Sequence, residues 1–157
     1  MNAAQLSMLT LCFIVKSGRA TQRLFFDTLV QTTKLPSQAH LLEIGPGTGQ
    51  ATQPLAKRGY KITAIELGSE LASVARETLK NYADVQVLTG AFEEIELPEQ
   101  SFDLVYSATA FHWIKPEIQF TKPYKLLKSN GHLAIIHTNH VSDEKRRRLF
   151  LCHSADL

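Results

Sequence analysis

The chain has 157 residues, of which 44% are hydrophobic and 20% charged, and its formal net charge is +2 at pH 7. This length supports one domain with a hydrophobic core and is short for two, so we expect a single domain over residues 1–157. The small net charge argues against nucleic acid as a partner, and the basic run at 145–148 is expected to be a solvated tail.

An apolar run at 8–15 precedes the first predicted helix. It is too short to span a membrane, and it lacks the preceding basic residues and the clear cleavage site of a secretory signal. We therefore expect a buried helix or strand end there. Cys12 and Cys152 lie outside any CxxC pair or metal-spaced cluster, so we expect no metal site and a reducing cytoplasm.

Helices and strands alternate along the rest of the chain. The expected strands are 40–44, 61–67, 84–90, 102–109 and 132–138. The expected helices are 19–33, 48–58, 70–82 with Ser69 as N-cap, and 116–127, which ends before a turn at 129–131. This alternation predicts an α/β fold, a doubly wound, Rossmann-like and mainly parallel sheet of about five strands. Such sheets bind ligands at the carboxyl ends of their strands.

The first of these strands runs into a glycine-rich turn, EIGPGTGQ. Its glycines are Gly45, Gly47 and Gly49. A dinucleotide site typically has the pattern G-x-G-x-x-G, but Gln50 stands where its third glycine belongs. Glu43, two residues ahead of the first glycine, would repel a pyrophosphate and attract a cationic group. The turn therefore favours a cationic, phosphate-free nucleoside, although a structural role for Glu43 in capping the turn stays open.

A second acid, Glu66, ends the second of these strands, 19 residues after Gly47. A carboxylate at this position can accept hydrogen bonds from both ribose hydroxyls. It therefore indicates a nucleoside without separating NAD from other nucleosides. The alternative interpretation is a solvated strand end.

The motifs E-I-G-P-G-T-G, I-E-L and F-D-L-V-Y-S, in that order, resemble the class I S-adenosylmethionine-dependent methyltransferases. A-F-H-W-I at 110–114 resembles their small-molecule branch, which includes trans-aconitate-type enzymes. The resemblance covers about residues 38–139. It implies S-adenosyl-L-methionine as cofactor and methyl transfer to a small molecule. Nothing in the sequence argues for nucleic acid or a membrane as partner, so we expect neither.

The resemblance also implies roles for individual residues. Glu43 would receive the methionine amino group, directly or through water, and Glu66 would bind the ribose hydroxyls. Leu67 would pack on the adenine. The backbone of the turn would line the methionine and ribose portions through Gly45, Pro46, Gly47 and Gly49.

The chain departs from the family after the third of these strands. Many relatives have G-D-A there, and the aspartate binds the adenine amino group, but this chain has Ala91 at that position. Losing such a charged hydrogen bond costs on the order of 1.5–3 kcal/mol. The backbone N–H near Phe92 is then expected to bind adenine and its ring to cover it, with Glu93 as a candidate substitute for the lost acid.

Methyl transfer mainly requires proximity and alignment, and a general base only where the acceptor must lose a proton. His112, in the loop after the fourth of these strands, is the candidate base, with a water-facing loop residue as the alternative. Phe111 and Trp113 flank it and are candidates for a substrate pocket or for cation–π contact with the sulfonium. Core packing is the alternative for Phe111.

Both ends of the chain depart from the family. Residues 1–20 do not resemble the usual N-terminal segment, and the tail at 143–157 changes character. Relatives continue after the fifth of these strands with a helix and an antiparallel strand pair, which need roughly 25–30 residues. About 20 residues follow His137 here, so the C-terminal strands of the seven-stranded sheet are expected to be missing. A truncated or frame-shifted gene would explain both ends.

These departures leave two alternatives to an active methyltransferase. One is a catalytically inactive, cofactor-binding fragment whose last predicted strand is a free edge that allows self-association. The other is an NAD(P)-dependent oxidoreductase, which Gln50 and Glu43 disfavour.

Overall fold

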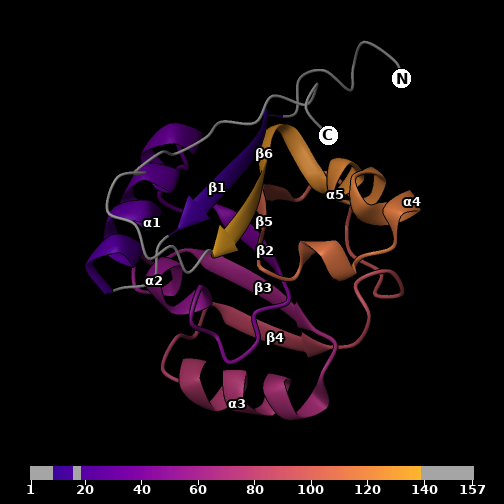
Figure 1. Ribbon diagram of the computed structural model, residues 1–157, viewed down its shortest axis with the longest axis horizontal. Coiled ribbons are helices and arrows are strands. Elements are labelled where there is room, and N and C mark those ends of the chain that lie inside the picture. Colours follow the sequence, from indigo (N-terminus) through magenta and orange to yellow (C-terminus); the bar gives the residue numbers. More distant parts are fainter. Residues whose placement is uncertain (1–8, 16–18, 139–157) are drawn as a thin grey trace.

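One parallel sheet organises this computed structural model, which describes residues 9–15 and 19–138. The strands are β1 (Leu9–Val15), β2 (His40–Ile44), β3 (Lys61–Glu66), β4 (Val85–Thr89), β5 (Phe102–Ala108) and β6 (Leu127–Thr138). Their order across the sheet is β1-β6-β5-β2-β3-β4 (Figure 1). The doubly wound, Rossmann-like sheet and its five expected strands are confirmed, and β1 adds a sixth. The basic run 145–148, Cys152 and the tail 143–157 lie outside the described residues.

The apolar run near the start of the chain forms the strand β1. It pairs in parallel with β6, from Leu9 opposite His132 to Val15 opposite Thr138. The expectation that the last predicted strand has a free edge is therefore wrong, because β6 is paired with β1 on one side and β5 on the other. The outer strands of the described sheet are β1 and β4.

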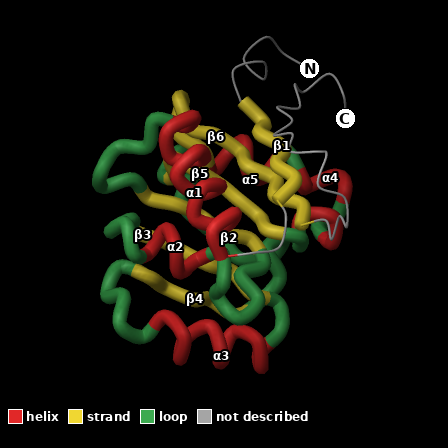
Figure 2. The backbone as a smooth tube through the Cα atoms, turned by 60° about the vertical axis from the view of Figure 1, so that its left-hand side comes forward, coloured by secondary structure: helices red, strands yellow, loops and turns green. Residues whose placement is uncertain are grey.

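Helices cover both faces of the sheet because each parallel connection must cross over it. The helices are α1 (Arg19–Thr33), α2 (Thr52–Ala56), α3 (Ser69–Leu79), η2 (Phe111–Trp113, a 3-10 turn), α4 (Pro116–Gln119) and α5 (Thr121–Leu126). Residues of α1 and α2 share one hydrophobic core with one sheet face, and residues of η2 and α5 share a second core with the other. Helix α3 lies along β3 and β4 (Figure 2).

The expected helix 116–127 is interrupted. Helix α4 ends at Gln119 and α5 begins at Thr121. Pro123 explains the break, because a proline ring inside a helix clashes with the carbonyl four residues earlier, which here is that of Gln119. In α5, Pro123 lies in the first turn, where its missing N–H costs nothing. The second half of the expected helix is therefore a separate element.

The expected turn at 129–131 is wrong, because β6 runs through it. Phe102 of β5 pairs with Leu127, but Leu104 pairs with His132, so the intervening residues of β6 form a bulge. A methyl group on Gly131 would lie 2.8 Å from Leu127 Cδ2 and 3.0 Å from the carbonyl oxygen of Lys128. The Ser-Asn-Gly segment therefore marks a tight irregularity within a strand.

Candidate functional site

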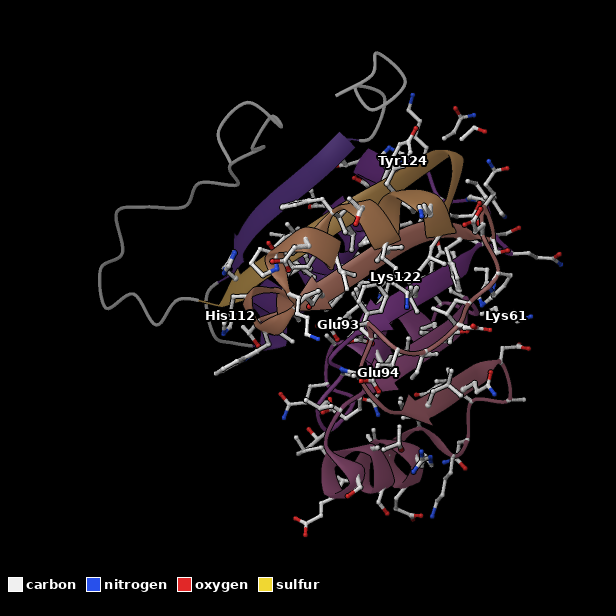
Figure 3. The ribbon with its side chains drawn as sticks, turned by 90° about the vertical axis from the view of Figure 1, so that its right-hand side faces the viewer. Lys61, Glu93, Glu94, His112, Lys122 and Tyr124 are labelled. Carbon is white, nitrogen blue, oxygen red and sulfur yellow. The ribbon has the colours of Figure 1, made fainter. Side chains whose placement is uncertain are left out.

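The predicted ligand residues gather at the carboxyl edge of the sheet. The N–H of Gly45 donates to the Ile65 carbonyl at 2.9 Å, and the N–H of Gly90 donates to the Glu66 carbonyl at 2.9 Å. These bonds join the loops after β2 and β4 to the end of β3. Figure 3 shows His112 at the edge toward which the strand arrows point and Lys61 at the opposite edge. The loops after four adjacent strands therefore meet at one place.

The glycine turn leaves open space over its centre. Gly45 has φ +71°, and a methyl group on it would lie 2.3 Å from the Cβ of Ala110, so the turn presses against the loop after β5. Gly47 has φ +57°, and a methyl group on it would meet no atom within 4 Å. The N–H of Gly49 donates to the Pro46 carbonyl at 2.9 Å and closes the turn. A ligand can therefore approach the backbone at Gly47.

Glu66 holds this turn from the end of β3. Its Oε2 accepts the N–H of Gly47 at 2.9 Å, and its Oε1 accepts the N–H of Gly68 at 3.0 Å. The side chain is buried, so the interpretation as a solvated strand end is wrong. The expected N-cap at Ser69 is also wrong, because Gly68 is the N-cap of α3. Each carboxylate oxygen of Glu66 keeps capacity for a further hydrogen bond.

Glu43 is fully buried on β2, on the sheet face that α1 and α2 cover. Its Oε2 accepts the hydroxyl of Tyr106, its register partner on β5, at 2.7 Å. Its Oε1 has no hydrogen-bond partner among the described residues, and neither does the buried Oγ1 of Thr52. A buried carboxylate with one unpaired oxygen is an unusual feature, since most buried polar groups are hydrogen-bonded.

Burial raises the pKa of Glu43 to about 7. The nearby Thr52 hydroxyl and the hydrogen bond from Tyr106 oppose this rise, and the charge of Glu66 adds to it. The same burial, together with the Glu43 charge and hydrogen bond, raises the pKa of Tyr106. A cation close to Glu43 would favour its ionised form. The environment of Glu43 therefore suits a positively charged ligand group.

On the predicted adenine side, Leu67 is 71% exposed, beside the end of β3. The Ala91 carbonyl accepts the N–H groups of Glu94 and Ile95 at 3.0 and 3.1 Å, which closes a turn after β4. The ring of Phe92 is buried in the core that η2 and α5 share, so its face is committed to packing. Glu93 is engaged as well, because its Oε1 accepts the N–H of Lys115 at 3.1 Å.

On the predicted substrate side, the three residues of η2 separate into core and surface. Phe111 is buried and makes an edge contact with Phe120, with ring centroids 5.4 Å apart. Trp113 is 79% exposed, and its ring lies 4.9 Å from that of His112, which is also exposed. Of the three, His112 and Trp113 are therefore accessible to a substrate. Phe111 packs in the core beneath the surface.

Three residues of the site escaped prediction. Tyr106 and Thr52 lie beside Glu43, and Lys122 of α5 contacts the turn after β4. Tyr106 was missed because its place beside Glu43 depends on the register of β2 against β5, which cannot be predicted from the two strand sequences alone. Among the described residues, Lys122 Nζ donates to backbone carbonyl oxygens. Every residue carries such an oxygen, so the sequence holds no signal for this contact.

The match to a family model described as Methyltransferase domain covers residues 42–135. This span contains the glycine turn, both acids and the loops after β4 and β5. The chain belongs to the family of methyltransferase domains.

Two curated relatives and one solved structure illustrate the similarity. An uncharacterized methyltransferase of Mycobacterium tuberculosis is 33% identical over 103 residues, which are 65% of this chain and 41% of that protein. A probable ribosomal RNA small subunit methyltransferase A of Methanosarcina mazei is 32% identical over 124 residues, which are 79% of this chain and 41% of that protein. A SAM-dependent methyltransferase from Aquifex aeolicus has the same fold, with a TM-score of 0.62 and 24% identity over 78% of this chain and 66% of that one.

The chain spans about two fifths of the length of the curated relatives that it matches. In the part of the chain that the structure describes, no three or more His, Cys, Asp or Glu side chains form a group that could hold a metal ion. Among the same residues, no helix has both the length and the hydropathy to cross a membrane.

Proposed function

We propose that this chain binds S-adenosyl-L-methionine and transfers its methyl group to a small molecule. The observation that carries the proposal is the unpaired Oε1 of buried Glu43, close to a glycine turn that leaves open space at Gly47. The cofactor carries an ammonium and a sulfonium and no phosphate, so an acid beside the turn attracts it. A dinucleotide would bring a pyrophosphate to the same place and be repelled.

The residues present fit this group. Glu43 would receive the ammonium, directly or through water, and the remaining lone pairs of Glu66 would accept the ribose hydroxyls. The exposed side chain of Leu67 would pack on the adenine ring, and the Phe92 N–H would donate to it. The backbone of Gly45, Pro46, Gly47 and Gly49 would line the methionine and ribose portions of the cofactor. Ala91 would lie beside the adenine.

The cofactor supplies a methyl group that its sulfonium activates, so the protein needs to align the acceptor rather than to activate it strongly. We assign this alignment to His112 and Trp113, which are exposed at the same edge of the sheet. Where the acceptor carries a proton that it must lose, His112 is the proposed general base.

A small-molecule substrate agrees with the formal net charge of +2, since RNA-binding proteins neutralise many phosphates with Lys and Arg. The ribosomal RNA named for the Methanosarcina relative is the alternative acceptor. An inactive, cofactor-binding fragment would keep the same cofactor site without turnover. We retain the cytoplasm as the proposed compartment, because the two cysteines form no paired-cysteine motif.

Calorimetric titration of the 157-residue chain tests the cofactor class. We expect heat on addition of S-adenosyl-L-homocysteine, the reaction product of the cofactor, and none on addition of NAD. Glu66→Gln removes the charge and is expected to weaken binding by roughly tenfold or more, because charged hydrogen bonds contribute about 1.5–3 kcal/mol. Glu70→Gln, an exposed acid in the first turn of α3, is the matched control and is expected to bind as the wild type does.

Heat with NAD and none with S-adenosyl-L-homocysteine would refute the proposal. Unchanged affinity in Glu66→Gln would remove the ribose role from that residue alone. Methyl transfer from radiolabelled cofactor to extracted metabolites, compared with transfer to extracted ribosomal RNA, then separates the two acceptor classes.

A further inference from the structure

Lys122 on α5 directs its whole ammonium group at the turn after β4. Its Nζ donates to the carbonyl oxygens of Phe92 at 2.6 Å, Glu93 at 3.2 Å and Ile95 at 2.7 Å. It also lies 5.0 Å from the centroid of the Phe92 ring. An ammonium has three donors, so a single turn uses all of them. Figure 3 shows Lys122 close to Glu93, between α5 and this turn.

These contacts fix the direction of one backbone N–H group. The Ala91 carbonyl points into the turn, where it accepts the N–H groups of Glu94 and Ile95. In a trans peptide the carbonyl and the following N–H point in opposite directions, so the Phe92 N–H points out of the turn. The next carbonyl, that of Phe92, points toward Lys122. Lys122 and the bonds to the Ala91 carbonyl therefore hold the turn, and the Phe92 N–H points away from it.

Lys122 thus ties helix α5 to the turn after β4, which further bonds join to neighbouring elements. The turn after β4 is joined to the end of β3 through the Gly90 N–H, and to α4 through the bond from Lys115 to Glu93. Burial lowers the pKa of the Lys122 ammonium, and the charges of Glu93 and Glu96 oppose this shift. Lys122 is thus a partly buried cation whose charge is balanced by backbone carbonyls and nearby acids. A lysine that pointed into solvent would not hold the turn in this way.

We infer that Lys122 is a positioning residue for adenine recognition, because it holds the turn Ala91–Ile95 so that the Phe92 N–H faces the nucleobase. The inference rests on the proposed function and extends it. Ala91 stands where many relatives have an acid that binds the adenine amino group. In this chain the Phe92 N–H, which Lys122 of α5 positions, would instead donate a hydrogen bond to a ring nitrogen of adenine.

The test compares two ligands that differ at the base. S-adenosyl-L-homocysteine offers N1 as an acceptor, whereas S-inosyl-L-homocysteine carries a hydrogen on N1 and cannot accept there. We expect the wild type to prefer the adenine ligand. Lys122→Met is expected to lose roughly tenfold in affinity for the adenine ligand and most of its preference over the inosine ligand. Lys122→Arg, which keeps charge and donors, is expected to retain part of that preference.

Lys125→Met is the matched control, since Lys125 lies on the same helix with an exposed side chain. We expect it to keep the wild-type affinity and preference. Amide hydrogen exchange gives a readout without ligand: the N–H groups of Glu94 and Ile95, which bond the Ala91 carbonyl, are expected to exchange faster in Lys122→Met than in Lys125→Met. If Lys122→Met does not fold, Lys122→Gln provides the same comparison.

The outcomes separate the two proposals. A wild type that binds the adenine ligand, together with a Lys122 variant of equal affinity, preference and exchange, would overturn the role of Lys122 and leave the proposed function standing. A loss of stability with an unchanged preference would also overturn it, because a merely structural lysine weakens both ligands alike. A wild type that binds neither ligand would overturn the proposed function and the adenine role together.

Discussion

At the scale of single residues, Gly47 and Gly59 form a natural matched pair. Both have positive φ, +57° and +82°, and a methyl group on either would meet no atom within 4 Å. Alanine at either position carries a similar backbone strain, on the order of 1 kcal/mol. We expect Gly47→Ala and Gly59→Ala to lower the midpoint of urea unfolding alike. We expect only Gly47→Ala to weaken binding of S-adenosyl-L-homocysteine, because its methyl group enters the proposed ligand space.

Calorimetry and urea unfolding of the two variants check this prediction. Equal ligand affinity in both variants would place the ligand away from Gly47. A much larger loss of stability in Gly47→Ala would mean that the space beside it is structural. Neither result depends on knowing the methyl acceptor.

The chemistry of single residues was predictable where it follows from position along a strand. Glu43 and Glu66 could be predicted to lie at the carboxyl edge of the sheet, because both stand at the ends of their strands, where a parallel sheet binds its ligands. Tyr106 could not, because its bond to Glu43 depends on the register of β2 against β5. The burial of the Phe92 ring could not either, because it depends on packing against η2 and α5.

At the scale of elements, the bulge in β6 makes a specific prediction. A methyl group on Gly131 would lie 2.8 Å from Leu127 Cδ2 and 3.0 Å from a backbone oxygen, so Gly131→Ala forces a neighbour to move. We expect a loss of about 1–3 kcal/mol in the free energy of unfolding, which is typical of overpacking. Ser129→Ala, an exposed change in the same segment, is the control, and urea unfolding measures both. Equal stability of the two variants would contradict the tight bulge.

The boundaries of elements were predictable where hydrophobic periodicity and breakers agree. The helix 19–33 and the strand 40–44 match α1 and β2 residue for residue. The region 116–131 was misread, because apolar spacing suggested one helix and Ser-Asn-Gly suggested its end. Pro123 carried the missing signal, since a proline inside a helical pattern ends the helix ahead of it. The strand character of 127–131 depends on pairing with β5, which local sequence does not contain.

At the scale of the whole molecule, the buried acid links stability and ligand binding to pH. The pKa of Glu43 is raised from 4.5 to about 7, so between these values the folded state binds more protons than the unfolded state. The free energy of unfolding is therefore expected to fall as pH rises through this window, by on the order of 1–3 kcal/mol. A ligand ammonium favours the ionised carboxylate, so affinity for S-adenosyl-L-homocysteine is expected to rise over the same window.

Thermal unfolding with and without this ligand, from about pH 5 to about pH 8, measures both trends. Tyr106→Phe removes a donor that lowers the pKa of Glu43, so it is expected to move the rise in affinity to higher pH. Tyr60→Phe changes a buried tyrosine of the same core away from Glu43 and is expected to leave the rise in place. An affinity independent of pH in the wild type would contradict the role of Glu43.

The pairing of β1 with β6 has a consequence for the order in which the protein folds. Leu9 pairs with His132, so nearly the whole described chain lies between the two partners. Contacts of such high contact order form late, because the closure of a long loop loses entropy before the contacts compensate for it. During synthesis β1 leaves the ribosome before the other described strands, and its partner β6 follows only after the four strands that lie between them in the sequence. We therefore expect β1 to be the last of the described strands to pair, because its pairing cannot begin until β6 has been synthesised.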